Sequence, residues 1–582
     1  MLAATLGSLI AVGLFFTLVL LLVSATASLL VNPSEAGVVK SNSILDLNLN
    51  IPITDRNPDL DELAILFELN DQVLGLPEIL TALEKATNNP NIKGIRLRAD
   101  LITTGWSQTR TLREALKKFQ NSGKFIYAYA ELLTQKGYYL CSVADTLVLN
   151  PVGNIEFKGL ASEVRYYKDF QEEYGIKMEV VRLGKYKSAV EPFLENRMSE
   201  ANRKQITSLL NDLWGTLKKE IAESRALVPD SLDQLIIDQK ISTPEEALKA
   251  QLIDGLGYES DLEDLLTQKL KLTNNKEINT TSLSAVNQSI EDYDTQVKDR
   301  IAIVYATGPI LYGEGTRSII AQGVFVETLQ DLATDDWVKA VVVRIDSPGG
   351  SALTSELLWQ ALEVVKKEKP VLVSMGNTAA SGGYYMAAGA DQIYAEPLTI
   401  TGSIGVFATL PNAHSLLKKN GINSEIVETH PNALGYSIFQ PLSPAFEAQL
   451  KKGIEHTYST FKKRVAEGRG LTEAQVELLA QGRVWTGNQA LENGLVDALG
   501  GLPETIKAAA QAANIEKYNT IAYPQFEKDL SSLVSDLQLN VAMGQLFNFL
   551  FPQSVQSKIE QIQQSLPTDY IQTALPYELK IY

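Results

Sequence analysis

Short apolar stretches alternate with amphipathic ones along this chain, and the pattern predicts strands that alternate with helices. Residues 340–345 and 370–375 are almost wholly apolar runs, as in strands that are buried on both faces of a parallel sheet. Between them, residues 353–367 carry apolar side chains at helical spacing and end in Lys366 and Lys367, where the helix dipole favours cations. The order strand, helix, strand predicts βαβ units, a largely parallel sheet and an α/β fold class.

The same pattern occurs twice at a fixed offset of 246 residues, which holds without a gap from residue 91 (matching 337) to residue 175 (matching 421). A register shared over this length indicates a tandem duplication of one domain rather than a chance likeness between two α/β domains. The matches include Gly137-Tyr138-Tyr139 with Gly383-Tyr384-Tyr385, Pro151 with Pro397, Gly159 with Gly405 and, at an offset of 243, residues 247–257 with 490–500.

The duplication divides the chain into domains. We expect an N-terminal domain over residues 40–270, a C-terminal domain over residues 301–525, and a linker over residues 271–300, which are rich in Asn, Thr, Ser and Asp. Residues 526–582 would form a C-terminal tail. Its apolar stretch, residues 546–551, is too short to span a bilayer, so we expect it at a subunit contact, against the membrane or within the core of the chain.

The N-terminal segment has no charged residue from Leu2 to Val31. Because about 20 apolar residues can span a bilayer as a helix, residues 1–31 are expected to form a transmembrane anchor. Ala25-Thr26-Ala27 resembles a small-residue cleavage site, so a cleaved signal peptide is the alternative, although the length of the apolar run favours the anchor. No Lys or Arg precedes Lys40, so the positive-inside rule gives no orientation.

The amino-acid composition of the chain excludes several classes of function and of metal or disulfide site. The formal net charge of −17 repels phosphate backbones, so nucleic-acid binding is not expected, and any membrane attachment must be hydrophobic. The single cysteine, Cys141, excludes an intrachain disulfide and a cysteine-based zinc site, and no metal or cofactor is expected. Only three histidines are present, His414, His430 and His456, although most serine hydrolases use one as a base.

Two glycine-rich turns in the second copy carry candidate chemistry. Asp346-Ser347-Pro348-Gly349-Gly350-Ser351 follows one predicted strand, and Ala379-Ala380-Ser381-Gly382-Gly383 follows the next. Glycines at such positions let the backbone bend and point N–H groups outward, where they can bind an oxyanion beside a nucleophilic serine. Neither turn matches a Walker P-loop or the G-x-S-x-G elbow of the α/β-hydrolases.

Each copy lacks a candidate catalytic residue that the other copy keeps. Ser381 corresponds to Gln135 in the first copy, and Gly349-Gly350 corresponds to Thr103-Thr104. The first copy keeps Lys187 within Gly184-Lys185-Tyr186-Lys187-Ser188-Ala189-Val190-Glu191-Pro192-Phe193, whereas the matching position in the second copy is Ala433. One half has the serine and the other has the lysine, which predicts a single site built from both halves.

With these motifs, the chain resembles the long, duplicated form of the signal peptide peptidase A family of serine proteases, as far as Gly494-Leu495-Val496-Asp497. The resemblance implies that Ser381 is the nucleophile and Lys187 the general base. It implies tandem crotonase-like domains, spirals of ββα units related to the Clp protease. It also implies a bowl-shaped homo-oligomer, a tetramer, on the outer face of the bacterial inner membrane, where peptide substrates left by preprotein processing are degraded.

A serine–lysine pair makes definite demands on its surroundings. The ordinary lysine pKa of about 10.4 must fall towards neutrality, and burial at a domain interface can lower it. Lys185 is the alternative base, but two residues along an extended segment it would face the opposite side. The N–H groups of Gly349 and Gly382 would form the oxyanion hole. Ser403 matches a family serine that holds the lysine in place. The alternative is that the Ser403 hydroxyl only caps a turn.

Other functions fit parts of this sequence. A crotonase-like acyl-CoA enzyme would share the fold, but it would not need Ser381 and would lack CoA outside the cell. A Ser-His-Asp hydrolase would use His414 or His430. A membrane scaffold without activity would explain the degenerate first copy, but not the retention of Ser381, Lys187 and both glycine pairs.

Overall fold

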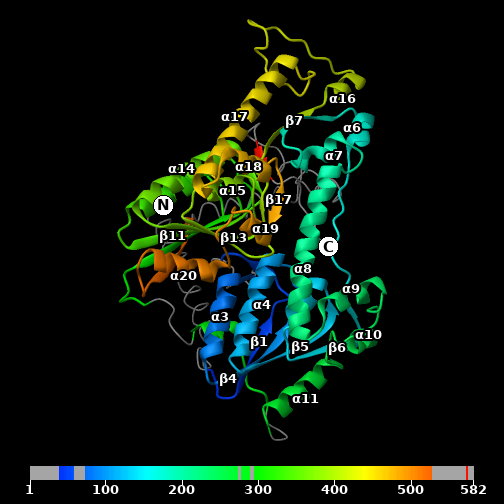
Figure 1. Cartoon of the computed structure of the whole chain (residues 1–582), viewed down its shortest axis with the longest axis vertical. Helices are drawn as coiled ribbons and strands as arrows, with labels where there is room; N and C mark the ends of the chain where they lie inside the picture. The colour runs from blue at the N-terminus through cyan, green and yellow to red at the C-terminus, as the bar shows by residue number, and fades with distance from the viewer. Residues whose placement is uncertain (1–38, 58–72, 273–276, 289–293, 527–571, 575–582) are drawn as a thin grey trace, which may run out of the picture.

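The computed structural model describes residues 39–57, 73–272, 277–288, 294–526 and 572–574 (Figure 1). The expected anchor and the apolar stretch 546–551 lie outside these residues. Among the residues that are described, no helix has both the length and the apolar character needed to cross a membrane.

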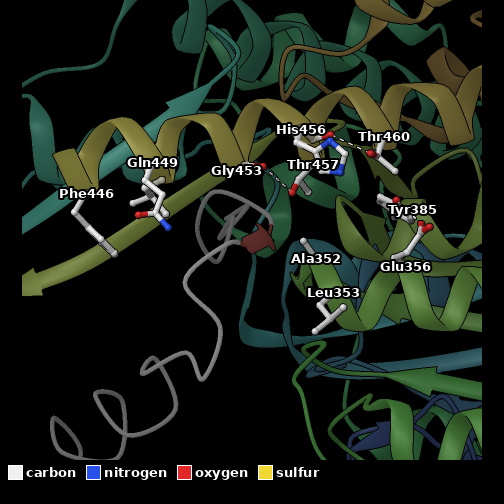
Figure 2. Close-up of a pocket in the computed structure, with 11 residues that line it drawn as sticks. Ala352, Leu353, Glu356, Tyr385, Phe446, Gln449, Gly453, His456, Thr457 and Thr460 are labelled. Atoms are coloured by element: carbon white, nitrogen blue, oxygen red, sulfur yellow. Dashed lines mark hydrogen bonds between the residues drawn. The ribbon is translucent and has the colours of Figure 1, made fainter. Parts of the chain in front are cut away.

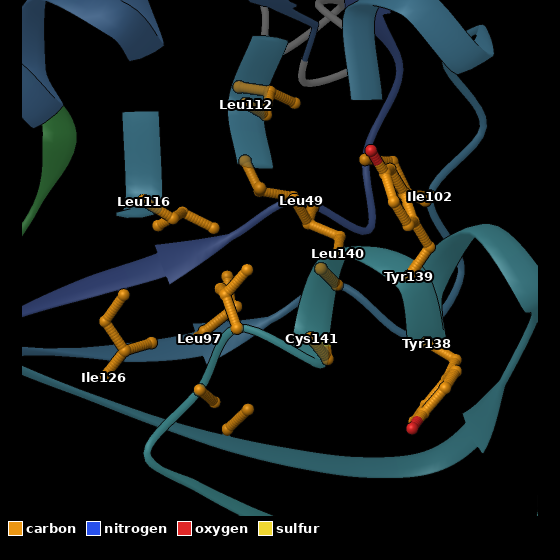
Figure 3. Close-up of a cluster of buried hydrophobic side chains, with 14 of the residues drawn as sticks. Leu49, Leu97, Ile102, Leu112, Leu116, Ile126, Tyr138, Tyr139, Leu140 and Cys141 are labelled. Carbon is orange, nitrogen blue, oxygen red and sulfur yellow. The ribbon is translucent and has the colours of Figure 1, made fainter. Parts of the chain in front are cut away.

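The first half of the chain forms a parallel sheet of six strands, as the apolar runs of its sequence require. Its strand order is β8-β6-β5-β4-β1-β9, with β1 (Ser43–Asn48), β4 (Ile92–Arg98), β5 (Phe125–Leu133), β6 (Thr146–Ile155), β8 (Gly255–Leu256) and β9 (Thr280–Thr281). Figure 3 shows part of its core, where Leu97 and Ile126 from the sheet lie near Leu112 of α4 and Tyr138 and Cys141 of α5. Cys141 is therefore the buried apolar residue that its isolation in the sequence suggests.

The helices of the first half cover this sheet or extend from it. They are α3 (Leu76–Asn88), α4 (Trp106–Asn121), α5 (Gln135–Cys141), α6 (Lys168–Tyr174), α7 (Glu191–Leu194), α8 (Glu200–Arg225), α9 (Pro229–Ile237), α10 (Pro244–Lys249), α11 (Glu259–Lys269) and α12 (Leu283–Gln288). A small separate pair is formed by β2 (Ile53–Thr54) and β3 (Leu74–Gly75).

The second half repeats the parallel arrangement in a sheet of eight strands, with β17 added antiparallel at one edge. The path is β17-β15-β13-β11-β10-β19, and β14 and β18 branch from β13. The strands are β10 (Arg300–Thr307), β11 (Val338–Ser347), β13 (Val371–Ala380), β14 (Gln392–Ala395), β15 (Ile400–Gly402), β17 (Val484–Thr486), β18 (Ala498–Leu499) and β19 (Asn519–Tyr523).

The helices of the second half are α13 (Gln322–Thr334), α14 (Ala352–Glu368), α15 (Gly382–Ala387), α16 (His414–Lys419), α17 (Pro444–Arg469), α18 (Glu473–Leu479), α19 (Gly487–Glu492) and α20 (Leu502–Ala512). The expected strands at 340–345 and 370–375 are confirmed as parts of β11 and β13, and the helix between them is confirmed as α14. α14 begins where expected because the Ser351 hydroxyl accepts a hydrogen bond from Thr354 N.

A third sheet joins the two halves. β7 (Lys177–Leu183) of the first half pairs antiparallel with β16 (Val406–Asn412) of the second, over seven residue pairs. β20 (Gln572–Ala574) lies between β16 and β12 (Gly349–Ser351) and pairs antiparallel with both. Figure 1 shows the result: β7, α6 and α7 lie beside α16 and α17 of the second half, far from the first half's own sheet.

The segment expected to be a linker, residues 271–300, is partly folded. β9 extends the first sheet by pairing with β1, and α12 packs against α3. The linker stays a prediction, and its described residues include a short strand and a short helix. A polar composition does not prevent a short strand or helix when a preformed sheet edge and a helix are available to pair with it.

Candidate active site

Ser381 occupies a strained turn between β13 and α15. Its backbone has φ 55° and ψ −112°, a conformation that costs a residue with a side chain free energy and that is concentrated at functional sites. The turn is held because Ser381 N donates a hydrogen bond of 2.8 Å to Gly402 O on the neighbouring strand. The side chain is fully buried, at the N-terminus of α15.

Lys187 reaches this serine from the other half of the molecule. Its Nζ lies 2.7 Å from Ser381 Oγ, and 3.0 Å and 3.1 Å from the carbonyl and hydroxyl oxygens of Ser403. The structure therefore brings three of the predicted site residues together. Ser403 does more than cap a turn, since both of its oxygens face the lysine.

Glycines make the space that the lysine side chain fills. A Cβ on Gly482 would lie 2.5 Å from Lys187 Cβ, and a Cβ on Gly405 would lie 3.2 Å from Lys187 Cδ. Neither glycine is predicted from the sequence to have this role. Gly405 has a possible signal, because it matches Gly159 in the repeat; Gly482 has none.

Burial of Lys187 favours the neutral form of its amine. The side chain is fully enclosed, and this desolvation lowers its pKa well below the ordinary lysine value. Its described polar contacts are hydroxyl and carbonyl oxygens rather than carboxylates, so no anion within them restores the charged form. A neutral amine beside a serine hydroxyl can accept its proton, which an ammonium cannot.

The loop that carries Lys187 is fastened to helix α8. Gln205 Nε2 donates to Tyr186 O at 3.0 Å and to Ser188 Oγ at 2.8 Å, so it holds the residues on either side of the lysine. Gln205 Oε1 accepts from Val484 N of β17 at 3.4 Å. One buried amide thus ties the lysine loop to the second half, next to the strand pair that supports Ser403. Sequence reasoning missed Gln205, because nothing distinguishes it within an amphipathic helix.

The two glycine turns of the second copy lie against each other. A Cβ on Gly383 would be 3.0 Å from Ser347 O, so the turn that contains Ser381 touches the turn that contains Gly349. Gly382 opens α15, and the first N–H groups of a helix have no partner within it. Gly349 N donates to Ser347 Oγ at 3.1 Å, so an oxyanion at this N–H would replace the serine hydroxyl as acceptor.

The half-buried carboxylate of Asp346 links β11 to β13 behind the two turns. Asp346, at the end of β11, accepts hydrogen bonds of 3.0 Å from Thr378 N and from Asn377 Nδ2 on β13. Burial, followed by the charge of Asp55, raises the pKa of Asp346 to about 6. Arg344 forms a two-point ion pair with Asp55 from the first half, at 2.7 Å and 2.8 Å. The ion pair between Arg344 and Asp55 therefore joins the first half to β11, close to the strand ends that carry the site.

A strand-pairing edge, which β20 occupies, and a pocket adjoin the site. β20 shows that the edges of β12 and β16 accept an antiparallel strand. A pocket of about 720 Å³ lies between α14 and α17, with Leu353, Phe446 and Leu450 among its lining residues and Tyr385 four residues after Ser381 (Figure 2). Among its polar residues, Glu356 already has partners, because it pairs with Arg464 and accepts a hydrogen bond from Tyr385 Oη.

The alternative bases lie elsewhere. Lys185 is exposed, with its Nζ 5.1 Å from the centre of the Tyr186 ring. His414 Nδ1 contacts Phe439 O, and His430 Nδ1 contacts Thr429 Oγ1, so the described contacts of neither histidine include Ser381. Burial raises the pKa of the Cys141 thiol to about 12, which makes it a poor nucleophile.

The first copy has no such site at the matching position. Gln135 Oε1 accepts hydrogen bonds from Lys158 N and Gly159 N, and its Nε2 donates to Gly159 O. The Thr104 hydroxyl donates to Gln108, and Thr104 O accepts from Lys136 Nζ. Side chains therefore satisfy the backbone groups around this turn of the first copy.

Sequence comparisons agree with the duplication. The profile of Peptidase family S49 matches residues 118–273 and again residues 363–516. Protease 4 of Haemophilus influenzae is 33% identical over 91% of this chain and 89% of its own length. Protease 4 of Salmonella typhi is 34% identical over 83% and 78%, and the chloroplastic serine protease SPPA of Arabidopsis thaliana is 30% identical over 94% and 81%.

Proposed function

Because this chain belongs to peptidase family S49, whose domain it carries twice, it is a serine peptidase, and we propose that Ser381 and Lys187 form its catalytic dyad. The observation that supports the dyad is the 2.7 Å contact between Lys187 Nζ and Ser381 Oγ in a fully buried setting. A serine hydroxyl is a weak nucleophile without an adjacent base, and no other base contacts it among the described residues.

Acylation follows from this geometry. Ser381 Oγ attacks the carbonyl carbon of the scissile bond while Lys187 Nζ takes the hydroxyl proton. The negative charge that develops on the carbonyl oxygen is stabilised by the N–H groups of Gly382 and Gly349, the latter released from Ser347. The new ammonium donates to both oxygens of Ser403 and then passes its proton to the leaving amine as the peptide bond breaks.

Deacylation uses the same groups in reverse order. Neutral Lys187 takes a proton from a water molecule that attacks the acyl-enzyme ester, and the oxyanion again forms at the two glycine N–H groups. Collapse of the intermediate breaks the bond to Ser381 Oγ, which recovers its proton from the lysine. Ser403 acts as a positioning residue, since it holds the amine through both steps.

We propose that the substrate is an extended, largely apolar peptide, of the kind that cleaved signal peptides provide, cut by endopeptidase action. The pairing of β20 with β12 and β16 supports this, because a peptide main chain that took the place of β20 would bind as an antiparallel strand at the same edges. The pocket beside α14 and α17 offers Leu353, Phe446 and Leu450 to an apolar side chain.

The setting of this activity is also part of the proposal. Residues 1–31 would anchor a homo-oligomer, with a tetramer as the expected state, in the bacterial inner membrane, with both halves on the extracytoplasmic side. The two α/β halves would be crotonase-like spirals, the fold in which strand ends and glycine turns form an oxyanion hole.

A fluorophosphonate probe tests the dyad most directly. The probe reacts with activated serines, so we expect one labelled peptide that contains Ser381, and no label on Ser381→Ala. Lys187→Ala should lose labelling although Ser381 is present, whereas Lys185→Ala should keep it. Equal labelling of Lys187→Ala and the unchanged enzyme would eliminate the lysine base.

A further inference from the structure

Helix α4 of the first half begins without a cap of its own. Its N-cap residue is Gly105, which has no side chain that could accept a hydrogen bond from the first turn. In the offset of 246 residues, Gly105 matches Ser351, the N-cap of α14. The Ser351 hydroxyl accepts a hydrogen bond of 3.2 Å from Thr354 N, so the second copy caps the corresponding helix with its own side chain. The first copy lacks this hydroxyl.

The second half supplies the missing cap. Asn377 Oδ1, on β13, accepts a hydrogen bond of 3.2 Å from the N–H of Gln108, the residue that matches Thr354 in the repeat. A Cβ on Gly105 would lie 2.1 Å from Asn377 Oδ1, so any side chain at position 105 would collide with the amide. In Figure 1, one end of α4 points towards the strands of the second half, and the helix contacts β13. One half therefore leaves space at a helix end, and the other half fills it.

Asn377 belongs to a bulge in β13 directly before the Ser381 turn. The pairing of β11 with β13 shifts here, so that residues 376–378 of β13 stand opposite Asp346 alone. A bulge of this kind bends its strand and changes the direction of the side chains that follow. It ends three residues before Ser381, the proposed nucleophile. The conformation of the bulge therefore affects where Ser381 Oγ lies relative to Lys187.

Asp346 connects the bulge to the glycine turn that contains Gly349. Its two carboxylate oxygens accept hydrogen bonds of 3.0 Å, one from Thr378 N and one from Asn377 Nδ2. The Asn377 amide thus has a fixed orientation, because its Nδ2 faces an acceptor of β11 and its Oδ1 faces a donor of α4. In this way a helix end of the first half is joined to both strand ends that carry the site.

A second contact between α4 and the bulge lies beside the first. The Ser107 hydroxyl of α4 lies 3.1 Å from Thr399 Oγ1, and Thr399 Oγ1 donates a hydrogen bond of 2.7 Å to Gly376 O of the bulge. All three residues are buried, so water does not compete for these groups. Two consecutive residues at the start of α4 therefore hold two consecutive residues of the bulge.

We propose that Asn377 is a positioning residue for the peptidase reaction: by capping α4 of the first half, it holds the bulge of β13 in the conformation that places Ser381 beside Lys187. The inference rests on the proposed dyad. Docking of the first half then has two separate effects on the site, since it supplies the lysine and also fixes the strand that carries the serine. Asn377 does not line the described pocket between α14 and α17, so its loss should act on kcat rather than on KM.

Removal of the amide from the full-length chain tests the positioning role. Asn377→Ala should lower kcat about 10- to 100-fold with KM nearly unchanged, because a small displacement of the reacting atoms is costly. The rate at which a fluorophosphonate labels Ser381 should fall by a similar factor. The urea midpoint of unfolding should also fall, since α4 loses its cap. The matched control is Thr243→Ala, which removes the N-cap of α10 in the same half and should lower the midpoint without changing kcat.

A double variant separates helix capping from positioning. Gly105→Ser with Asn377→Ala gives α4 the kind of cap that Ser351 gives α14, because the serine takes the space of the removed amide. We expect the urea midpoint to recover and kcat to stay low, since no side chain then joins the start of α4 to Asp346. Recovery of kcat together with the midpoint would show that Asn377 acts only through stability, and would overturn the proposal.

An exchange of two side chains tests the hydrogen bonds themselves. Asp346→Asn alone leaves two donors facing each other, and Asn377→Asp alone leaves two carboxylates facing each other. In the double variant, the new amide donates to the new carboxylate, which still accepts from Gln108 N, and the amide oxygen accepts from Thr378 N. Each single variant should lose kcat and labelling rate, and the double variant should regain most of both. A double variant no better than the single ones would contradict the proposal.

The labelling results distinguish failure of this inference from failure of the dyad. If the unchanged enzyme is not labelled at Ser381, the dyad is wrong and the inference is overturned with it. If the unchanged enzyme is labelled at Ser381, and Asn377→Ala is labelled as fast and has the same kcat, the inference alone is overturned.

Discussion

In the first copy of the repeat, Gln135 fills its turn and hydrogen-bonds the backbone of Lys158 and Gly159, whereas in the second copy Ser381 stands at the same position and faces an amine. The surrounding framework is almost unchanged. Tyr138 and Tyr384 donate to Leu252 O and Leu495 O at 3.0 Å and 2.8 Å. The packing around the turn is therefore the same in both copies, and the first copy supplies the lysine that contacts Ser381.

The largest difference between the copies should appear at these matched turn positions. Ser381→Ala is expected to reduce peptide turnover by about 10⁴-fold or more, because no other nucleophile replaces the hydroxyl. Gln135→Ala should change turnover less than about tenfold, while buried backbone groups that lose their partners lower the free energy of unfolding by about 1–3 kcal/mol. Steady-state kinetics and urea denaturation of both variants measure this contrast; comparable turnover losses would contradict it.

The next effect concerns the lysine that the first copy contributes. Lys187→Ala should reduce turnover by about 10²- to 10⁴-fold, the range for loss of a general base. Lys185→Ala, two residues away and exposed, should retain nearly full activity. Measured kcat values for the two variants decide between them, and near-normal turnover by Lys187→Ala would return His414 and His430 to consideration.

The lowered pKa of Lys187 also predicts how turnover and the free energy of unfolding change with pH. Turnover should be present above that pKa and be lost as the pH falls through it, since the ammonium cannot accept a proton. Between this pKa and the ordinary lysine value the unfolded chain binds one more proton, so the free energy of unfolding rises with pH. Lys187→Met should remove this dependence and raise the Tm at neutral pH. A Tm below that of the unchanged enzyme would contradict the assigned cost of burying the lysine.

A smaller effect distinguishes the steric clash of an added Cβ from the strain of a positive φ angle. Gly482 has φ +79° and lies against Lys187, whereas Gly494 has φ +72° and nothing near the position of a Cβ. Both alanine variants carry similar backbone strain, but only Gly482→Ala must displace the lysine. We expect kcat to fall about 10²-fold for Gly482→Ala and to change little for Gly494→Ala. Equal losses in the two variants would show that strain alone is responsible.

The smallest effect should be equal in the two copies. Arg225 pairs with Asp254, and Arg469 pairs with Asp497, through two hydrogen bonds in each case. Arg225→Lys and Arg469→Lys lose the two-point geometry, and we expect each to lower the free energy of unfolding by about 1 kcal/mol, with kcat hardly changed. Urea titration tests whether the framework has remained equivalent; a cost in only one copy would show that it has diverged.

The sequence predicted the central strands and the site for different reasons. β11, β13 and α14 follow from local patterns, because a buried parallel strand must be apolar along its length. Ser381 and Lys187 followed from complementary losses between the copies, together with the family resemblance. The pairing of β7 with β16 had no comparable signal, since its strands are far apart in the chain and β7 is half polar. Gln205 and Gly482 matter only through tertiary neighbours, which no single-sequence pattern records.

The burial of Lys187 between the halves also bears on how the enzyme is made. While the chain is being synthesised, the lysine segment emerges long before the serine, and until the halves dock its amine remains in water and protonated. If the proposed dyad is right, a partly folded chain holds Ser381 without its base and would not cleave the newly made polypeptides around it. Under the proposed dyad, docking of the two halves is therefore itself the step that activates the enzyme.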